Sequence, residues 1–102
     1  MKMYICIKDD IPVGIAMNSA AHAGLMCHLK YKDTQPYETW LAKSFKKVTC
    51  MVTPAEFAML KEVSDNIIVT ESRLDGKEVA IVLSPRPETD YPEFVSLLKL
   101  WK

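Results

Sequence analysis

The chain has 102 residues, of which 49% are hydrophobic and 25% are charged, and its 13 basic side chains balance its 13 acidic ones. This length supports one hydrophobic core, so we expect a single domain over residues 1–102. The balanced charge excludes a global field that draws the protein to nucleic acid or to a membrane. A modest local excess of lysine between Lys30 and Lys47 is a candidate basic patch, although such clusters are usually solvated helix surface.

The cysteines indicate the redox environment. Cys6, Cys27 and Cys50 lie far apart and contain no C-x-x-C pair, which is typical of reduced thiols and not of a disulfide framework. The N-terminal run lacks the apolar segment of a signal peptide, and no stretch approaches the roughly 20 apolar residues that span a bilayer. We therefore expect a soluble, cytoplasmic protein without membrane contact.

The N-terminal third predicts a strand and a long helix. Met3–Ile7 is short, apolar and rich in isoleucine, as expected of a buried strand. An aspartate cap from the Asp9-Asp10 pair, with Pro12 in the first turn, is a helix-start signal. The helix should then continue to about Tyr31.

The middle of the chain predicts a second helix, a strand and a third helix. Tyr37–Ser44 is expected to be a short helix anchored by Trp40 and Leu41, and Val48–Val52 is apolar and β-branched like a strand. The segment 53–56, Thr-Pro-Ala-Glu, has the residues of a capping box with proline at the first helical position. This third helix should run to about residue 63, with three side chains inward: Phe57, Leu60 and Val63.

A β-hairpin is expected next. Asn66–Ser72 and Glu78–Ser84 read as strands, and between them Asp75-Gly76 supplies the positive backbone angles of a tight turn. These two strands should pair antiparallel.

The last expected element is an amphipathic helix. Asp90 and Glu93 form a cap signal, and four apolar side chains follow at helical spacing: Phe94, Leu97, Leu98 and Trp101. The complete order is β-α-α-β-α-β-β-α. It predicts an α/β fold with a single mixed four-stranded sheet that has helices on both faces.

The first helix carries two sets of side chains. One row consists of small residues that can pack closely on the sheet: Ala16, Ala20, Ala23, Gly24 and Cys27. On an adjacent row Asn18 and His22 can project together near the junction of the first strand and this helix. Ligands bind at such junctions in open α/β sheets, so the pair is a candidate binding site. The alternative is a partly buried histidine satisfied by local hydrogen bonds.

Metal binding and cysteine nucleophilicity are not favoured by the pattern. His22, Cys27 and His28 do not share the closed spacing of a zinc site. The cysteines are expected on buried faces, where a thiol is inert. We expect no metal and no cofactor.

The chain resembles a known family in two places. Residues 8–14 (K-D-D-I-P-V-G) and 19–23 (S-A-A-H-A) are similar to the R-x-D-L-x-M-G and Q-C-S-H-A segments of the second class of peptidyl-tRNA hydrolases. Residues 69–74 and 76–85 are similar to that family's D-A-G-R-T hairpin and closing strand, and the element order agrees. Residues 10–18 resemble even more the D-L-P-x-G-x-A-x-N opening of small bacterial domains of the same superfamily.

The resemblance implies a site at the first strand–helix junction. It identifies Lys8, Asp10, Asn18, His22 and Arg73 as candidate ligand-binding residues, with His22 and Glu71 catalytic only if the chain is an enzyme. The family's G-K-G-K turn has no counterpart, because the stretch from Gly14 to His22 is two residues shorter. With Arg73 aligned on the family arginine, Thr70 takes the place of its aspartate. Ester hydrolysis needs an activated water and stabilised negative charge, and these changes remove suppliers of both.

We therefore expect a domain that binds a small anionic ligand or a peptide end without peptidyl-tRNA hydrolase activity. A divergent hydrolase acting on peptidyl-tRNA or a related acyl ester is the alternative, with tRNA a partner only in that case. A homodimer is also expected, since self-association adds burial to a chain of this size. The aromatics Tyr37, Trp40 and Trp101 serve either such an interface or the protein's own core.

Overall fold

A mixed four-stranded sheet, in the strand order β2-β1-β4-β3, forms the centre of the protein. The computed structural model describes residues 1–102. Its regular elements are β1 (Lys2–Lys8), α1 (Val13–Tyr31), α2 (Gln35–Lys43), β2 (Lys46–Val52), α3 (Pro54–Leu60), β3 (Asn66–Glu71) and β4 (Lys77–Arg86), with three 3-10 turns, η1 (Ser72–Leu74), η2 (Glu88–Asp90) and η3 (Glu93–Leu97).

The strand pairing confirms the predicted fold class. β1 and β2 are parallel, from Lys2 opposite Lys46 to Lys8 opposite Val52, and α1 with α2 forms the crossover between them. β4 pairs antiparallel with both β1 and β3, so the sheet contains one more antiparallel ladder than the hairpin alone predicts. β1 is thereby placed in the interior of the sheet, paired on both sides.

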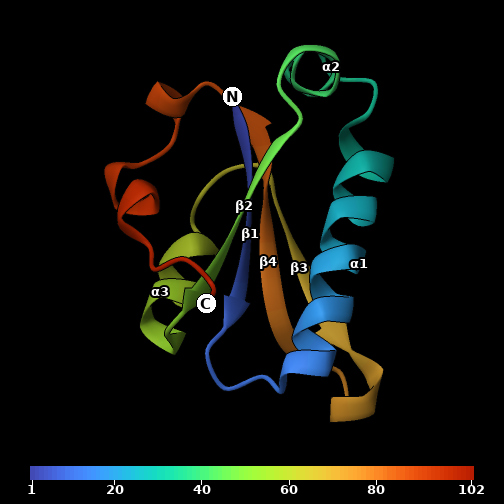
Figure 1. Ribbon diagram of the computed structural model, residues 1–102, viewed down its shortest axis with the longest axis vertical. Coiled ribbons are helices and arrows are strands. Elements are labelled where there is room, and N and C mark those ends of the chain that lie inside the picture. Colours follow the sequence, from blue (N-terminus) through green and yellow to red (C-terminus); the bar gives the residue numbers. More distant parts are fainter.

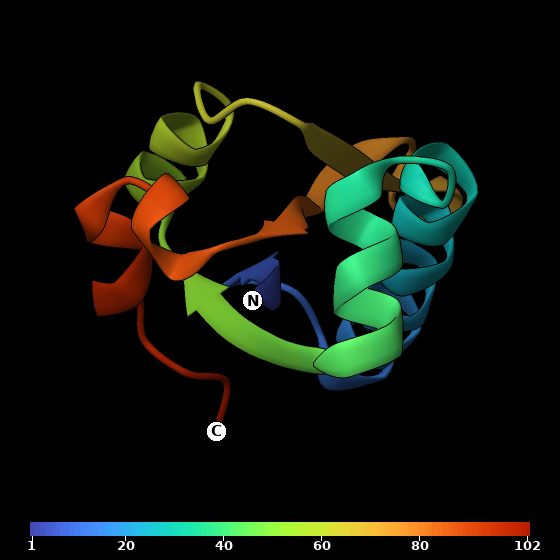
Figure 2. The same cartoon turned by 90° about the horizontal axis from the view of Figure 1, so that it is seen from above.

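Helices cover both faces of the sheet. α1 and α2 lie on one face, and α3 with η2 and η3 lies on the other (Figures 1 and 2). β1 supplies both cores because its side chains alternate: Met3, Ile5 and Ile7 pack toward α1, whereas Tyr4 and Cys6 pack toward α3. Each of these large apolar side chains contributes about 1.5–3 kcal/mol through burial.

α1 packs on the sheet through small side chains, as predicted. Ala16, Ala23 and Cys27 are at most 1% exposed, while Ala20 and Gly24 are half-buried beside them. The predicted aspartate cap is wrong: Pro12 is the N-cap residue, and no side chain caps the helix. The Asp10 carboxylate accepts a hydrogen bond from Lys77 instead.

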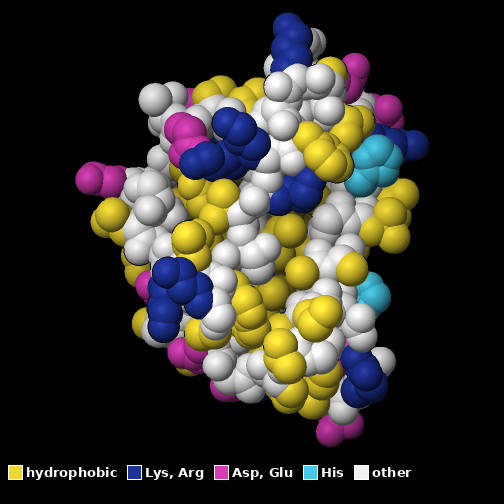
Figure 3. Space-filling view, viewed as in Figure 1, with side chains coloured by type: hydrophobic (Ala, Val, Ile, Leu, Met, Phe, Trp, Pro, Cys, Tyr) yellow, Lys and Arg dark blue, Asp and Glu magenta, His cyan; other side chains and the backbone are white.

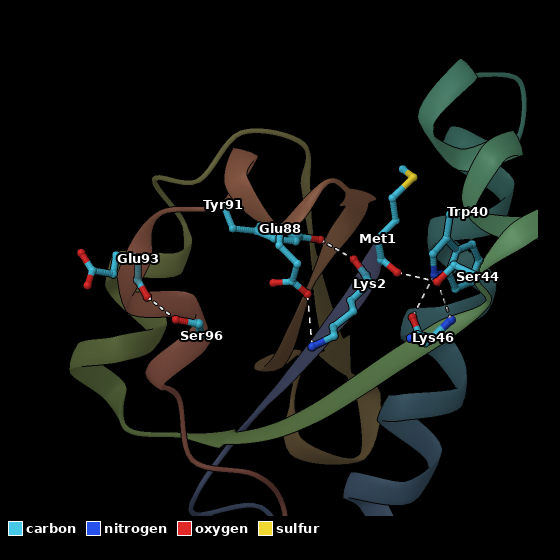
Figure 4. Close-up of polar contacts among 9 residues, drawn as sticks. All are labelled: Met1, Lys2, Trp40, Ser44, Lys46, Glu88, Tyr91, Glu93 and Ser96. Atoms are coloured by element: carbon cyan, nitrogen blue, oxygen red, sulfur yellow. Dashed lines mark hydrogen bonds and ion pairs between the residues drawn. The ribbon is translucent and has the colours of Figure 1, made fainter.

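α2 is anchored by two buried aromatics, and not by Leu41. Trp40 is 1% exposed and its indole N–H donates to the Lys46 carbonyl at 2.9 Å, whereas Leu41 is 44% exposed (Figure 4). Tyr37, which is 2% exposed, is the second buried anchor of α2, the role that was expected of Leu41. Tyr37 and Trp40 therefore cover the protein's own core, which answers the alternative posed for them.

The capping box of α3 is confirmed. The Thr53 hydroxyl accepts from the Glu56 amide at 3.1 Å, and the Glu56 carboxylate accepts from the Thr53 amide at 2.8 Å. The helix ends at Leu60, about one turn earlier than predicted. Its inward set is nevertheless correct, since Phe57, Leu60 and Val63 are all buried.

The antiparallel hairpin of β3 and β4 and the positive backbone angles at its end are as predicted, but the connection is residues 72–76, which begin with η1, and not a tight two-residue turn. Asp75 and Gly76 adopt positive φ angles of 55° and 77°, and Glu71 lies opposite Lys77 in the ladder. An aspartate tolerates this left-handed backbone better than most residues, and glycine adopts it freely.

The predicted C-terminal α-helix is wrong. Only the 3-10 turn η3 forms, and because 3-10 turns repeat every three residues, Val95 and Leu98 face the core while Leu97 is 77% exposed. The chain then extends along the free edge of β2: the Trp101 amide donates to the Thr49 carbonyl, and the Met51 amide donates to the Lys99 carbonyl. These edge bonds satisfy backbone groups that a helix would leave unpaired.

The α1-facing layer and the α3-facing layer meet at the amino end of β1. There the Tyr91 hydroxyl donates to the Lys2 carbonyl, the Ser44 hydroxyl donates to the Met1 carbonyl, and Lys2 pairs with Glu88 at 3.2 Å (Figure 4).

None of the helices combines the length and apolar composition that crossing a bilayer requires.

Replacing Thr53 with alanine tests the capping box. Thr53→Ala removes the side-chain acceptor for the Glu56 amide and should lower the free energy of unfolding by about 1 kcal/mol, measured by urea denaturation followed by circular dichroism. Thr89→Ala is the matched control, because Thr89 is exposed and its side chain bonds to no other group. Equal stability of Thr53→Ala and wild type would contradict the prediction.

Candidate functional site

Charged side chains converge where β1 leads into α1 and where β3 turns into β4. Asp10, in the β1–α1 connection, pairs with Lys77 at the start of β4, 2.8 Å from Oδ2 to Nζ. Glu71, the last residue of β3, pairs with Arg73 in η1, 3.3 Å from Oε1 to Nη2. Since Glu71 lies opposite Lys77 in the ladder, both pairs occupy the same end of the sheet.

Glu71 is the most firmly held of these groups. Its residue is 7% exposed, and Oε2 accepts hydrogen bonds from the Arg73 amide at 3.0 Å and from Arg73 Nε at 3.4 Å. The amide bond closes the 3-10 turn η1, for which Glu71 is the N-cap. The Arg73 amide, then the Arg73 side chain, and to a smaller extent the charge of His22 lower the pKa of Glu71.

The pKa of Asp10 is also lowered by a basic side chain, in this case that of Lys77. The hydrogen bond from Lys77 is the main cause that lowers the pKa of Asp10. Both side chains are about half exposed, at 56% for Asp10 and 41% for Lys77, so water screens this pair and it adds little stability. Its effect is to hold the β1–α1 connection beside the hairpin.

Asn18 and His22 lie one helical turn apart on the exposed surface of α1. Neither side chain makes a hydrogen bond within the protein, so the alternative of a partly buried, satisfied His22 is wrong. The charge of His22 makes a small contribution to lowering the pKa of Glu71. We call the six residues Asp10, Asn18, His22, Glu71, Arg73 and Lys77 the junction cluster.

Lys8 does not belong to this cluster. The alternation along β1 turns its side chain to the α3 face of the sheet, where Nζ lies 4.6 Å from the centroid of the Phe57 ring. The side chain of Lys8 is thus not grouped with Asn18 and His22, although its charge makes a small contribution to lowering the pKa of Asp10.

The junction cluster is a surface and not a crevice. The protein has two cavities, and no cluster residue lines either one. The larger, about 460 Å³, is at the opposite end of the sheet; the smaller, about 100 Å³, lies between α1 and β2 and is lined by six residues: Ile7, Ala16, Met17, Ala20, Thr49 and Trp101. Figure 3, in the orientation of Figure 1, shows hydrophobic side chains gathered in the lower centre of the visible face, with lysine and arginine side chains scattered around them.

No metal or nucleophile adds to the chemistry of the cluster. No group of three or more His, Cys, Asp or Glu side chains is placed so that it could hold a metal ion. All three cysteines are free and buried, and burial raises the pKa of the Cys27 thiol to about 11. A protonated, buried thiol is a poor nucleophile.

The fold class is α/β, with one mixed four-stranded sheet. No protein-family model matches the chain, and no curated protein matches it.

Sequence reasoning missed Lys77 and every residue of the larger cavity. Lys77 reads only as the end of a turn, and its pairing with Asp10 joins residues 67 positions apart. The β3–β4 ladder has a register shift between Val69 and Thr70, which changes the residue that lies opposite each position beyond it. No local sequence pattern predicts this shift.

The lowered pKa of Glu71 makes a prediction about pH. Because its folded-state pKa lies below its unfolded value, Glu71 contributes stability above the unfolded pKa, and this contribution is lost as pH falls through the folded pKa. Wild type should therefore exceed Glu71→Gln in free energy of unfolding at about pH 6, and the two should converge towards about pH 3. Urea denaturation across this range measures the difference.

The control for this experiment is Glu62→Gln, since Glu62 is exposed and forms no ion pair. A wild-type advantage over Glu71→Gln that stays constant with pH would show that the carboxylate charge is not what Arg73 stabilises.

Proposed function

We propose that this chain is a ligand-binding domain of peptidyl-tRNA hydrolase-like fold, and that it holds a small anionic ligand or a peptide end at the junction cluster. The observation that carries the proposal is the exposure of three polar side chains, Asn18 and His22 on α1 and Arg73 on η1. Asn18 and His22 make no hydrogen bond within the protein, and the side chain of Arg73 is 59% exposed. The element order up to β4 agrees with that of the resembled family and supports the proposal, although 3-10 turns take the place of the last helix.

Arg73 would supply the charge that holds an anion. Glu71 engages its Nε and Nη2 atoms, and Nη1 makes no contact within the protein. An arginine presents five N–H groups, so Nη1 still has two donors for a carboxylate or phosphate oxygen. The Glu71 contacts fix the orientation of the guanidinium, which lowers the entropy cost of binding.

Asn18 and His22 would orient the rest of the ligand. The amide offers both donors and an acceptor, and the imidazole offers one of each when neutral. Asp10 and Lys77, already paired with each other, would border the site and exclude ligands of the wrong charge pattern. An open surface of this kind favours the end of a chain over a molecule that must be enclosed.

Peptide ends provide the test. A dipeptide with an acetylated amino end and a free carboxylate should bind the wild type, and its amidated counterpart should bind about tenfold more weakly because it lacks the charge that Arg73 recognises. Asn18→Ala and His22→Ala should each weaken binding of the free acid. Isothermal titration calorimetry measures these affinities.

Lys8→Gln is the matched control, since Lys8 lies at the same end of β1 but on the other face of the sheet. Equal affinity of the acid and the amide, or no effect of either cluster substitution, would remove the proposal. Sedimentation of the same samples gives the oligomeric state, for which we propose a homodimer.

The alternative function is a divergent acyl-ester hydrolase. It is favoured by one observation, the small contribution of the charge of His22 to lowering the pKa of Glu71. A histidine oriented by a carboxylate is the usual arrangement of a general base. Against it stand the three Arg73 hydrogen bonds that already occupy Glu71, and the lack of a cavity at the junction cluster that would shield the reaction from water.

Incubation with N-acetyl-aminoacyl-tRNA separates the two functions. Under the binding proposal, release of the acyl group by wild type should equal that of a heat-treated sample. Release that depends on enzyme concentration and is abolished in His22→Ala and Glu71→Gln, but not in Lys8→Gln, would establish the hydrolase instead.

A further inference from the structure

A polar cleft of about 460 Å³ lies at the end of the sheet opposite the junction cluster. We call it the Arg86 cleft, and nine residues line it: Tyr31, Thr34, Pro36, Ser64, Asp65, Ser84, Pro85, Arg86 and Asp90. They come from the end of α1, the start of α2, the loop before β3, the end of β4 and η2. Small-molecule sites usually measure 300–1,000 Å³, so the volume suits a small ligand.

A β-bulge builds the floor of this cleft. Between the register pairs Tyr4–Leu83 and Lys2–Arg86, one residue of β1 faces two of β4, Ser84 and Pro85. Pro85 has no amide to donate, and a bulge is where a sheet accepts such a residue. The bulge also resets the alternation of side chains, so that Arg86 stacks on the Tyr91 ring, 4.7 Å from its centroid.

Arg86 carries a positive charge without an acidic partner. Its four side-chain hydrogen bonds go to neutral acceptors: the carbonyls of Ser64, Asp65 and Ser84 and the Ser64 hydroxyl. No ion pair includes it, although Lys2, opposite it in the ladder, is paired with Glu88. A guanidinium has five N–H groups, so one donor on Nη1 stays free. A half-buried guanidinium that has no acidic partner attracts an anionic group.

The cleft also contains a hydroxyl that the protein leaves without a partner. Ser84 lines the cleft, and its side chain makes no hydrogen bond within the protein although the residue as a whole is 6% exposed. Because this hydroxyl is open to the cleft, it can bond to a ligand atom there. Together, Arg86 and Ser84 place a positive charge and a hydrogen-bonding group on the same short stretch of β4.

Two carboxylates complete the charge pattern. Asp65 and Asp90 line the same cleft, and neither forms an ion pair. A simple anion such as phosphate would meet one positive and two negative charges, and the net repulsion would disfavour it. A ligand with both a negative and a positive group matches all three.

We infer that the Arg86 cleft binds a small zwitterion carrying a carboxylate and an ammonium group, for which a free amino acid is the simplest case. The carboxylate accepts from the free Nη1 donor of Arg86 and from the Ser84 hydroxyl. The ammonium group lies against Asp65 and Asp90. The site is separate from the junction cluster, because the length of β1, about 20 Å at 3.3 Å per residue, lies between them.

Calorimetric titration with the standard free amino acids tests the inference on the full chain. The tightest-binding amino acid should lose about tenfold in affinity when its amino group is acetylated, and again when its carboxylate is converted to the amide. Inorganic phosphate should bind more weakly than that amino acid. Shifts in the amide resonances of Ser84 and Arg86 on titration should locate the ligand.

Variants at the acidic rim decide whether the cleft is responsible. The double variant Asp65→Asn/Asp90→Asn should weaken amino acid binding about tenfold, since it removes both partners of the ammonium group. Asp75→Asn is the matched control: Asp75 and Asp65 share positive φ angles, 55° and 56°, which asparagine adopts readily, but Asp75 lies in the β3–β4 turn. Asp75→Asn should leave amino acid binding unchanged.

Three outcomes would overturn the inference. Acetylated and amidated forms that bind as tightly as the free amino acid would show that charge is not recognised. Binding unaffected by the double variant, or weakened equally by Asp75→Asn, would place the ligand elsewhere. No binding by any amino acid at millimolar concentration would leave Arg86 as a structural clamp that fixes the loop before β3 to β4.

Discussion

The burial of β1 on both faces and both edges is the constraint on which the structure depends. Each residue from Met3 to Ile7 is at most 4% exposed, and the strand pairs with β2 on one side and β4 on the other. Every layer packs against this strand, and its two ends carry the two candidate sites. Substitutions within it would therefore disturb both cores at once, whereas each site tolerates changes in its exposed groups.

Local signals in the sequence were sufficient where the structure is local. The capping box at Thr53 and the positive backbone angles at Asp75 and Gly76 are as predicted because each depends on a few neighbouring residues. The last element failed for the opposite reason. Its apolar spacing fits an α-helix, but the open edge of β2 offers hydrogen bonds to the extended chain, and a tertiary interaction outweighs the local preference.

The candidate sites show the same division. The resemblance and the helical spacing grouped Asn18, His22, Glu71 and Arg73. The structure pairs Glu71 with Arg73 and leaves Asn18 and His22 on the exposed surface of α1, while Lys8 lies on the α3 face of the sheet. The Arg86 cleft could not be predicted, since Arg86 meets Ser64 across 22 positions of sequence and the bulge that aims it has no local signature. The periodicity of a sequence does not predict a site whose residues are brought together by the register between strands.

The C-terminal segment along β2 has a consequence for how copies of the chain can meet. With that side covered by residues 99–101, only β3 presents an open row of amides and carbonyls. A strand from another molecule would find unpaired backbone groups along β3 but not at the middle of β2. The terminal segment thus protects one edge of the sheet from edge-to-edge pairing.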